Sequence, residues 1–381
     1  YQRHFGVRPC RYPLPAEWHL ADADAEGRLD CTALDVFSVD NASTRDIDDA
    51  LSFEWAGEPG GACTIGIHVA DVAARVSCGS TLFEWARKRV SSAYHGGLDD
   101  GVEEHAGGSV PMLPPELAHG ELSLNEGVPR PALSLFVGVD AGGAVLSRMH
   151  ARTTIVNRNA TTYAAFGADA APGAAAARNL LGRLSGSAEP EDHVAWAMIA
   201  YNAYFGQMLT AAADAAAAGG DGDGGVSSRG MLRVQPVAGT PATYALACAA
   251  GPRGHASLGL AHYAHTSSPI RRYSDLHNQH AALGTLVGAG AEPEMGAINA
   301  RASDIARYHA HTAAMELAYR CRDAPIEFDG HVEMADEGAC LRIYTGRGRV
   351  RVPLQVRPSA HPAVVRPEQE NLALAHASSA S

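Results

Sequence analysis

The chain lacks the features that identify secreted, membrane-spanning or zinc-binding proteins. Its seven cysteines are scattered over 381 residues and include no Cys-x-x-Cys pair, which argues against a disulfide framework or a zinc site. No uninterrupted apolar run approaches the roughly 20 residues of a membrane span, and no charged segment followed by an apolar one opens the chain. We therefore expect an intracellular location in a reducing compartment, the cytoplasm or the nucleus, without secretion or membrane contact.

The chain also has too few positive charges to bind nucleic acid over its whole surface. Thirty lysine and arginine residues face 42 aspartate and glutamate residues, for a net charge of −12. This balance excludes a protein that coats nucleic acid by bulk charge, but it leaves room for a narrow basic channel. Hydrophobic residues make up 46% of the chain, which is enough for a full core and excludes global disorder.

Carboxylates are concentrated in one short segment. Asp40, Asp46, Asp48 and Asp49 fall within ten residues. Crowded like charges raise one another's pKa unless a cation neutralises them, and clustered oxygen ligands are what Mg²⁺ selects. The segment is not an EF-hand, because a loop starting at Asp40 has arginine where glycine is required and leucine where glutamate is required. A solvated aspartate-rich turn is the alternative.

The context of this segment favours a functional site. Residues 50–55 alternate in polarity like a strand, residues 64–70 form a second strand, and Gly57 to Gly61 supply the turn between them. The carboxylates therefore lie at the open end of a hairpin, on backbone rigid enough to hold a metal ion.

Periodicity and turn residues predict the remaining elements. We expect helices over 81–90, 194–218, 277–286 and 298–319, strands over 133–139 and 145–156, a loop over 98–109 and short strands within 328–356.

A second candidate region lies far downstream. The segment from Gly254 to Leu276 contains Arg271 and Arg272 directly after a Ser-Pro pair. Paired arginines at a turn suit bidentate contact with phosphate. A surface arginine pair that caps a helix or forms ion pairs is the alternative.

Two histidine pairs in this region have the spacing of metal ligands. They are His262 with His265, and His277 with His280. No cysteine or carboxylate completes either set in the sequence, so we expect surface or hydrogen-bonding histidines.

The downstream segment resembles the signature of the RNB family of exoribonucleases, which includes ribonuclease II, ribonuclease R and the catalytic subunit of the eukaryotic exosome. The aspartate segment resembles that family's metal-binding motif, with the same spacing. Further landmarks follow in the family's order: residues 67–72, 110–114 and 122–125. The resemblance spans roughly residues 27 to 320.

The resemblance implies a mixed α/β (α+β) fold with a central sheet and surrounding helices. It also implies processive hydrolysis of single-stranded RNA from the 3′ end, with release of nucleoside 5′-monophosphates and with Mg²⁺ or Mn²⁺ as cofactor. Such chemistry agrees with the carboxylates, since two metals about 3.5–4 Å apart can activate a water and stabilise the departing oxygen. Single-stranded RNA is the one partner predicted; no protein partner is indicated.

The resemblance also implies a role for individual residues. Asp40, Asp46, Asp48 and Asp49 match metal ligands. Asp48 also matches the aspartate whose loss in the family blocks cleavage more than binding. Arg271 matches the arginine at the scissile phosphate.

Three further residues are implied to contact RNA: Tyr94, Arg272 and Tyr273. Tyr94 matches the tyrosine that stacks on a terminal base, and such stacking is worth about 1–3 kcal/mol per base. A core tyrosine is an equally good interpretation of Tyr94.

The chain departs from the family pattern at several places. An acidic stretch, residues 98–104, would repel phosphate near the site. Ala195 and Trp196 stand where the family has paired glutamates, and Thr266 replaces an aromatic residue. No cold-shock module precedes residue 27. These departures support an alternative function, a non-catalytic RNA-binding or scaffold protein built on a decayed RNB domain. A metal-binding structural domain without RNA is a third alternative.

The domain organisation follows from these boundaries. We expect an irregular lead-in over 1–26, the catalytic domain over 27–323, a short S1-like (OB) β-barrel over 324–357 and a disordered tail over 358–381.

Overall fold

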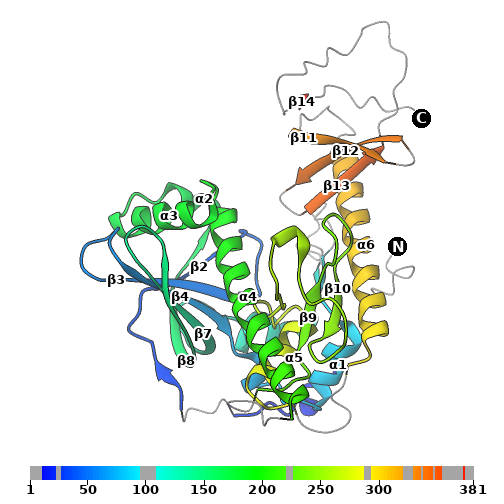
Figure 1. The fold of residues 1–381 in the computed structure, drawn as a ribbon, viewed down its shortest axis with the longest axis horizontal. Helices are drawn as coiled ribbons and strands as arrows, with labels where there is room; N and C mark the ends of the chain where they lie inside the picture. Colours follow the sequence, from blue (N-terminus) through cyan, green and yellow to red (C-terminus); the bar gives the residue numbers. More distant parts are fainter. Residues whose placement is uncertain are drawn as a thin grey trace, which may run out of the picture. The chain divides into compact units, whose positions relative to one another are not determined.

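The computed structural model describes residues 11–22, 27–94, 109–219, 226–286 and 293–320, and the backbone of four further strands after residue 328. It has the mixed α/β architecture that the sequence predicts (Figure 1). The chain divides into two compact units. The larger unit comprises residues 10–92 and 111–301, and the smaller unit comprises residues 1–9, 93–110 and 302–381.

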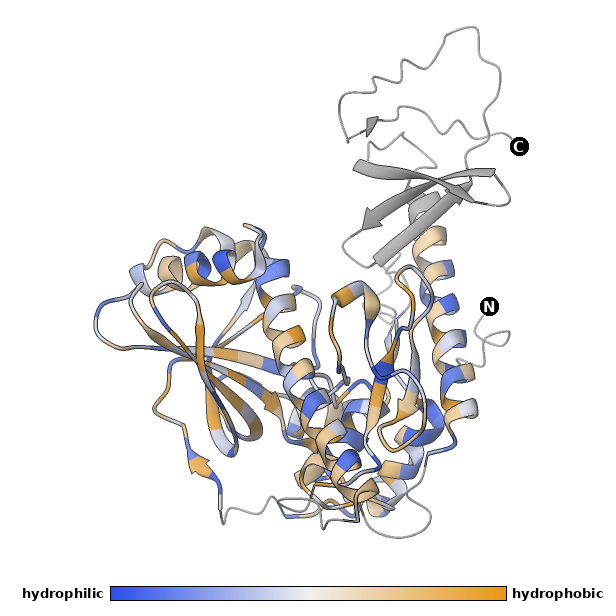
Figure 2. Ribbon diagram, viewed as in Figure 1, coloured by the Kyte–Doolittle hydropathy of each residue, from blue (hydrophilic) through white to orange (hydrophobic). Residues whose placement is uncertain are grey.

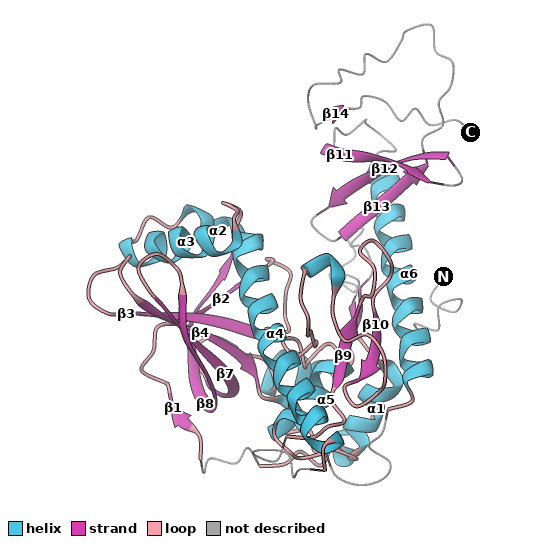
Figure 3. Cartoon of the chain, viewed as in Figure 1, coloured by secondary structure: helices cyan, strands magenta, loops and turns pink. Residues whose placement is uncertain are grey.

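A twisted sheet forms one half of the larger unit (Figure 3). Its strands run in the order β1-β8-β2-β3-β4-β7, and β8 also pairs with β7. Strands β2, β3, β4, β7 and β8 therefore close into a barrel. The strands are β1 (Leu29–Asp30), β2 (Val36–Asp40), β3 (Asp49–Trp55), β4 (Cys63–Ala70), β7 (Pro129–Val139) and β8 (Val145–Thr162).

The predicted hairpin is β3 and β4, which pair antiparallel from Asp49↔Val69 to Trp55↔Cys63. Strands β7 and β8 are longer than predicted. β8 extends to Thr162 because its last residues pair in parallel with β2, from Val36↔Asn157 to Asp40↔Thr162. A pairing of this kind depends on a distant segment, so local periodicity does not reveal it.

The outer side of the barrel is apolar and is covered by helices. Alternate residues of β4 and β7, such as Ile67 and Leu135, pack with Tyr201 and Phe205 of the long helix α4 (Pro190–Ala217). In Figure 2 the strands of this sheet are coloured mainly as hydrophobic. The Tyr201 hydroxyl donates to the Leu133 carbonyl at 3.0 Å, which fixes α4 on the sheet. Two shorter helices, α2 (Tyr163–Ala168) and α3 (Pro172–Ser185), extend this layer.

The inner side of the barrel carries a buried polar network. His68 Nε2 lies 2.9 Å from Ser52 Oγ, and His68 Nδ1 lies 2.7 Å from Ser134 Oγ. Ser134 Oγ in turn lies 2.7 Å from Thr153 Oγ1. Both ring nitrogens therefore have partners, although His68 is fully buried.

The second half of the larger unit is built around a helix that is polar and yet buried. Helix α5 (Tyr273–Ala282) has every residue buried. Its polar side chains bind backbone groups of other segments: Asn278 pairs with Met231, Gln279 Nε2 donates to the Ala70 carbonyl, and His280 Nε2 lies 2.9 Å from the Val76 carbonyl. The helix predicted over 277–286 thus begins and ends four residues earlier.

Two elements flank α5. Helix α1 (Thr81–Arg89) matches its prediction, and a two-stranded sheet pairs β9 (Met231–Val234) with β10 (Thr243–Leu246). Helix α4 passes close to the segment that leads into α5. A Cβ at Gly206 would lie 2.8 Å from Tyr263 Cα and from Ala264 N. Glycine is therefore required at this crossing.

The smaller unit contains the short strands β5 (Ala93–Tyr94) and β6 (Ser109–Val110), which pair antiparallel. Ala93 and Val110 pack against Tyr308 of helix α6 (Met295–Arg320), a helix that begins in the larger unit. A second sheet follows in the order β13-β12-β11-β14. Its strands are β11 (Asp329–Ala335), β12 (Gly338–Thr345), β13 (Gly348–Pro353) and β14 (Leu372–Ala373).

These strands agree with the short strands predicted between 328 and 356, and the S1-like barrel stays a prediction. Strand β14 falls in the segment predicted to be disordered. The predicted loop over 98–109 lies outside the described residues, except for Ser109.

Candidate active site

The two regions that the sequence singles out meet in the larger unit. Arg271 Nε donates to Asp48 Oδ2 at 2.9 Å, and the Ile270 N–H donates to Asp48 Oδ1 at 2.9 Å. The Asp48 side chain is 2% exposed, whereas the Arg271 side chain is 42% exposed. A buried carboxylate thus holds an accessible guanidinium.

The turn that carries Arg271 is fixed from three sides. Arg271 Nη2 donates to Ser268 Oγ at 3.0 Å. Asp275 accepts the Ser268 N–H at 2.8 Å. The Ser92 N–H, just after helix α1, donates to the Arg271 carbonyl at 2.9 Å. The position of the guanidinium therefore depends on α1, α5 and the Ser-Pro turn together.

Helix α4 supplies a further anchor, Asn202. Its Oδ1 accepts hydrogen bonds from the Thr266 N–H at 2.8 Å and from the Thr266 hydroxyl at 2.9 Å, and its Nδ2 donates to Ser267 Oγ at 3.2 Å. Thr266, which replaces an aromatic residue of the family pattern, is thus bound through its hydroxyl.

The aspartates lie at one end of the barrel. Asp40 ends β2, Asp49 begins β3, and the loop between these strands carries Asp46 and Asp48. Ser123 and Leu124 hold this loop, since the Ile47 N–H donates to Ser123 Oγ at 2.9 Å and the Leu124 N–H donates to the Ile47 carbonyl at 3.0 Å. The landmark at 122–125 therefore has a structural role beside the carboxylates.

Burial and mutual repulsion raise the pKa values of these carboxylates. Burial raises the pKa of Asp40 to about 7; the charge of Asp49 adds to this shift, and Arg271 opposes it. Burial raises the pKa of Asp49 to about 6, against Arg271 and Arg272. Burial also pushes the pKa of Asp48 upward, and the ion pair with Arg271 pulls it back down. The end of the barrel therefore has a surplus of negative charge that a cation would offset.

The donor set suits Mg²⁺ by its chemistry, because buried carboxylates that repel one another are stabilised by a hard divalent cation. However, within residues 11–320 as far as they are described, no three histidine, cysteine, aspartate or glutamate side chains converge closely enough to hold one ion. The assignment of metal ligands stays a prediction. Three of the four histidines in the two histidine pairs make hydrogen bonds: His265 with Tyr244, His277 with Arg229, and His280 with Val76. The Nδ1 of His262 is buried without a hydrogen-bond partner among the described residues.

The remaining predicted contact residues differ in accessibility. Arg272 is paired with Asp275 at 2.7 Å and its side chain is 23% exposed. Tyr273 is fully buried and its ring lies 5.4 Å from that of Phe83, so it packs in the core and offers no face to a base. Tyr94 belongs to the smaller unit, where its ring lies 5.6 Å from that of His309 and its side chain stays exposed.

Several residues near the carboxylates were not predicted. Asn202, Ser268 and Asp275 position the turn, and Tyr163 lies beside the acidic group. Burial raises the pKa of Tyr163 to about 12, and the charges of Asp49 and Asp40 add to this effect. Ser268 and Asp275 fall inside the signature segment, but no local pattern indicated the partners they have.

At the positions where the family has paired glutamates, Ala195 is exposed and Trp196 packs partly buried against the core of α4 and the sheet. Neither side chain can carry a charge to the site. The acidic stretch over 98–104 lies outside the described residues.

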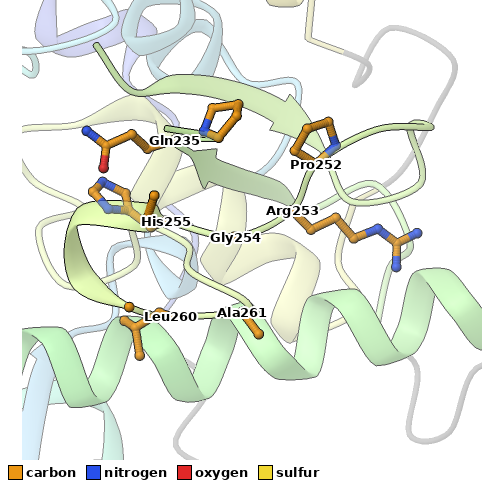
Figure 4. A pocket seen from close by; sticks show the side chains of 10 residues that line it. Gln235, Pro252, Arg253, Gly254, His255, Leu260 and Ala261 are labelled. Atoms are coloured by element: carbon orange, nitrogen blue, oxygen red, sulfur yellow. The ribbon is translucent and has the colours of Figure 1, made fainter. Parts of the chain in front are cut away.

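A cavity of about 460 Å³ opens elsewhere in the larger unit, lined by residues 235–236, 252–256 and 259–261. Figure 4 shows Gln235 and His255 together at one end and the Arg253 guanidinium at the other. None of the four aspartates lines it. This cavity is therefore separate from the candidate active site.

Known proteins similar in sequence include ribonucleases. Exoribonuclease 2 of Cronobacter sakazakii is 36% identical over 133 residues, which are 35% of this chain and 19% of that protein. Ribonuclease R of Thermotoga maritima is 37% identical over 123 residues, which are 32% of this chain and 16% of that protein. The aligned stretch thus covers less than a fifth of either relative.

Solved structures with the same fold include a ribonuclease and a pseudonuclease. Mycoplasma genitalium RNase R in complex with ribose-methylated single-stranded RNA has a TM-score of 0.65 at 16% identity, with 94% of this chain and 67% of that chain covered. Yeast Ssd1, a pseudonuclease, has a TM-score of 0.65 at 16% identity, with 90% and 52% covered. At such identity the likeness concerns the fold alone.

None of the helices described for this chain has the length and apolarity to cross a membrane. A sequence model of the RNB domain matches residues 28–177 and 234–286, more than half of the chain. The match includes all four aspartates and Arg271, and it confirms the resemblance seen in the sequence. The chain therefore belongs to the RNB domain family.

Proposed function

We propose that this chain is the catalytic part of a hydrolytic exoribonuclease that degrades single-stranded RNA from the 3′ end and releases nucleoside 5′-monophosphates. The ion pair between Asp48 and Arg271 carries the proposal, because it unites the two family motifs in one place. The names of the sequence relatives, exoribonuclease 2 and ribonuclease R, support the same reaction class.

Arg271 is the residue that meets the scissile phosphate. Hydrolysis adds a water oxygen to phosphorus and expels the 3′ oxygen of the preceding nucleotide, so negative charge builds up on the non-bridging oxygens in between. A guanidinium that is held by its Nε and is 42% exposed can donate to those oxygens without reorganising. Asp48 acts as a positioning residue, since both of its oxygens already accept hydrogen bonds from residues 270 and 271.

Asp40, Asp46 and Asp49 are the residues that would hold Mg²⁺. When bound, the ion would activate a water and neutralise part of the phosphate charge. Their surplus of negative charge supports this assignment, as the raised pKa of Asp40 indicates. In the absence of an ion the same charge would repel the RNA backbone.

A second candidate is an RNA-binding protein that has lost catalysis. Trp196 in place of a family glutamate, and the absence of a converging metal-binding group among the described side chains, favour it. The pseudonuclease Ssd1 shows that this fold occurs without activity.

One assay separates the two candidates. A single-stranded RNA labelled at its 3′ or its 5′ end is incubated with Mg²⁺ or with EDTA, and a circular RNA of the same sequence is the control. We expect labelled mononucleotide from the 3′-labelled strand at early times, only with Mg²⁺, while the circle stays intact. A gel shift without decay in either condition would reject the nuclease and favour the binder.

A further inference from the structure

Three guanidinium charges act on one half-buried histidine in the larger unit, and their partners differ. The charges of Arg272, Arg233 and Arg271 all act on His265 and, together with burial, lower its pKa well below the usual range. Arg271 pairs with Asp48, and Arg272 pairs with Asp275. Arg233 has no such carboxylate partner in the part of the chain that the structure describes.

Arg233 is nevertheless held firmly in place. It lies in the middle of β9, directly opposite Tyr244 of β10. Its guanidinium carbon lies 4.6 Å from the centre of the Tyr244 ring, so the two side chains stack as a cation–π pair. Its side chain donates no hydrogen bond within the described residues.

Hydrogen bonds hold Tyr244, the residue on whose ring Arg233 stacks, in a fixed position. Asn299 binds both backbone groups of Tyr244: its Oδ1 accepts the Tyr244 N–H at 2.7 Å, and its Nδ2 donates to the Tyr244 carbonyl at 2.9 Å. The Tyr244 hydroxyl lies 2.8 Å from His265 Nδ1 and 3.2 Å from Ser274 Oγ.

The same network continues to Arg271. Ser274 Oγ donates to Asp275 Oδ2 at 2.8 Å, and Asp275 Oδ1 accepts the Ser268 N–H. Ser268 Oγ in turn accepts from Arg271 Nη2. Hydrogen bonds therefore link Tyr244, on which Arg233 stacks, to Arg271. The guanidinium groups of Arg233 and Arg271 thus have a fixed relative position.

A half-buried guanidinium without a carboxylate is costly, because burial removes water that stabilises its charge. Burial lowers the pKa of Arg233, and Arg272 adds to the effect. An anion brought by a ligand would offset this cost. A planar guanidinium suits phosphate in particular, since it can donate two parallel hydrogen bonds.

We propose that Arg233 is a positioning residue that binds a second phosphodiester of the RNA strand, one other than the scissile phosphodiester at Arg271. This inference rests on the proposed function, and it assigns a residue that neither motif contains. Two fixed phosphate contacts would set the register of the strand, so that each cleavage removes one nucleotide.

The test measures RNA binding in EDTA, where no turnover occurs. Fluorescence anisotropy compares the unaltered protein with Arg233→Met, Arg233→Lys and the control Arg229→Met, which removes an exposed arginine four residues away. We expect Arg233→Met to weaken binding by about tenfold and to lower the salt slope by about one. Arg233→Lys should be intermediate, and Arg229→Met should bind like the unaltered protein.

A neutral methylphosphonate is then placed at each linkage in turn from the 3′ end. At one linkage, the methylphosphonate should weaken RNA binding by the unaltered protein but should not weaken binding by Arg233→Met. Equal affinity of Arg233→Met and the unaltered protein, or equal losses at every linkage, would overturn the inference. If Arg233→Met does not fold, Arg233→Lys carries the same comparison.

The two proposals can fail separately. If the unaltered protein releases mononucleotides but Arg233→Met binds normally, only the role of Arg233 is refuted. If the unaltered protein binds RNA through Arg233 but never shortens it, the nuclease is refuted and the phosphate contact stands. If the unaltered protein neither binds RNA in EDTA nor shortens it with Mg²⁺, both are refuted.

Discussion

Asp48 and Arg271 lie 223 positions apart in the sequence, and their side chains form an ion pair at 2.9 Å. The pair joins the buried carboxylate of Asp48 to the solvent-accessible guanidinium of Arg271. Breaking such a pair leaves a buried charge without compensation, so each partner depends on the other.

Asp48→Asn should abolish cleavage and leave RNA binding nearly unchanged. The Asn oxygen can still accept the Ile270 N–H, but its amide would then face Arg271 Nε–H, donor against donor. The guanidinium would turn away, and we expect a loss in turnover of roughly 100-fold or more. Single-turnover kinetics and gel shifts measure the two properties. Asp35→Asn, at an exposed position, is the control and should be fully active. Full activity of Asp48→Asn would refute the assigned site.

Arg271→Ala should lower kcat by roughly 100- to 1,000-fold, since one contact made in the transition state is worth about 2.7–4 kcal/mol. Arg271→Lys should recover only part of the loss, because lysine has a charge but lacks the Nε–H that binds Asp48. The KM for RNA should change much less than kcat in both variants. Unchanged turnover in Arg271→Ala would remove this residue from the mechanism.

Ser123→Ala should disturb the aspartate loop without touching a carboxylate. The Ile47 N–H would lose its acceptor, which costs about 1 kcal/mol in the free energy of unfolding. We expect turnover to fall more than stability alone explains, because Asp46 and Asp48 flank Ile47. Urea unfolding and steady-state kinetics test this, with Ser147→Ala, at an exposed strand position, as the control. Parallel small changes in both variants would contradict a positioning role for Ser123.

His68 should make the protein sensitive to acid. Burial lowers the pKa of His68 to about 3, whereas an unfolded histidine has a pKa of about 6.5. As the pH falls, the imidazole of residue 68 is therefore protonated in the unfolded chain before it is protonated in the folded protein. The contribution of His68 to the free energy of unfolding is fully present above about pH 6.5. It falls as the pH drops towards 3, by up to roughly 1.4 kcal/mol per pH unit.

His68→Gln removes this titration, and comparing it with the unaltered protein cancels the contribution of the other histidines. Urea unfolding at pH 7, 6 and 5 should show the variant less stable at pH 7 and the difference shrinking as the pH falls. A difference that stays constant with pH would mean that His68 is not buried in its neutral form.

The sequence predicted the hairpin β3–β4 and helices α1, α4 and α6 because their patterns are local. Alternation, a glycine turn and apolar spacing belong to each segment by itself. It also predicted which residues to examine for chemistry, through the spacing of the aspartates and the segment around Arg271.

Other parts of the fold could not be predicted because they depend on distant partners. Helix α5 has polar residues throughout and reads as a surface helix, yet Asn278, Gln279 and His280 are buried and bound to backbone groups far away in the sequence. The end of β8 is a strand only because β2 lies beside it. Similarly, nothing local to Arg233 indicates the Tyr244 ring beneath it.

The close crossing at Gly206 has a consequence for how this fold could lose its activity. Helix α4 and the backbone of Tyr263 and Ala264 meet there with no room for one added carbon. A methyl group at this position would push the segment that leads to residue 271 outward, while every acidic ligand kept its identity. A related protein that lost its activity in this way would still have all four aspartates, so its sequence would not reveal the loss.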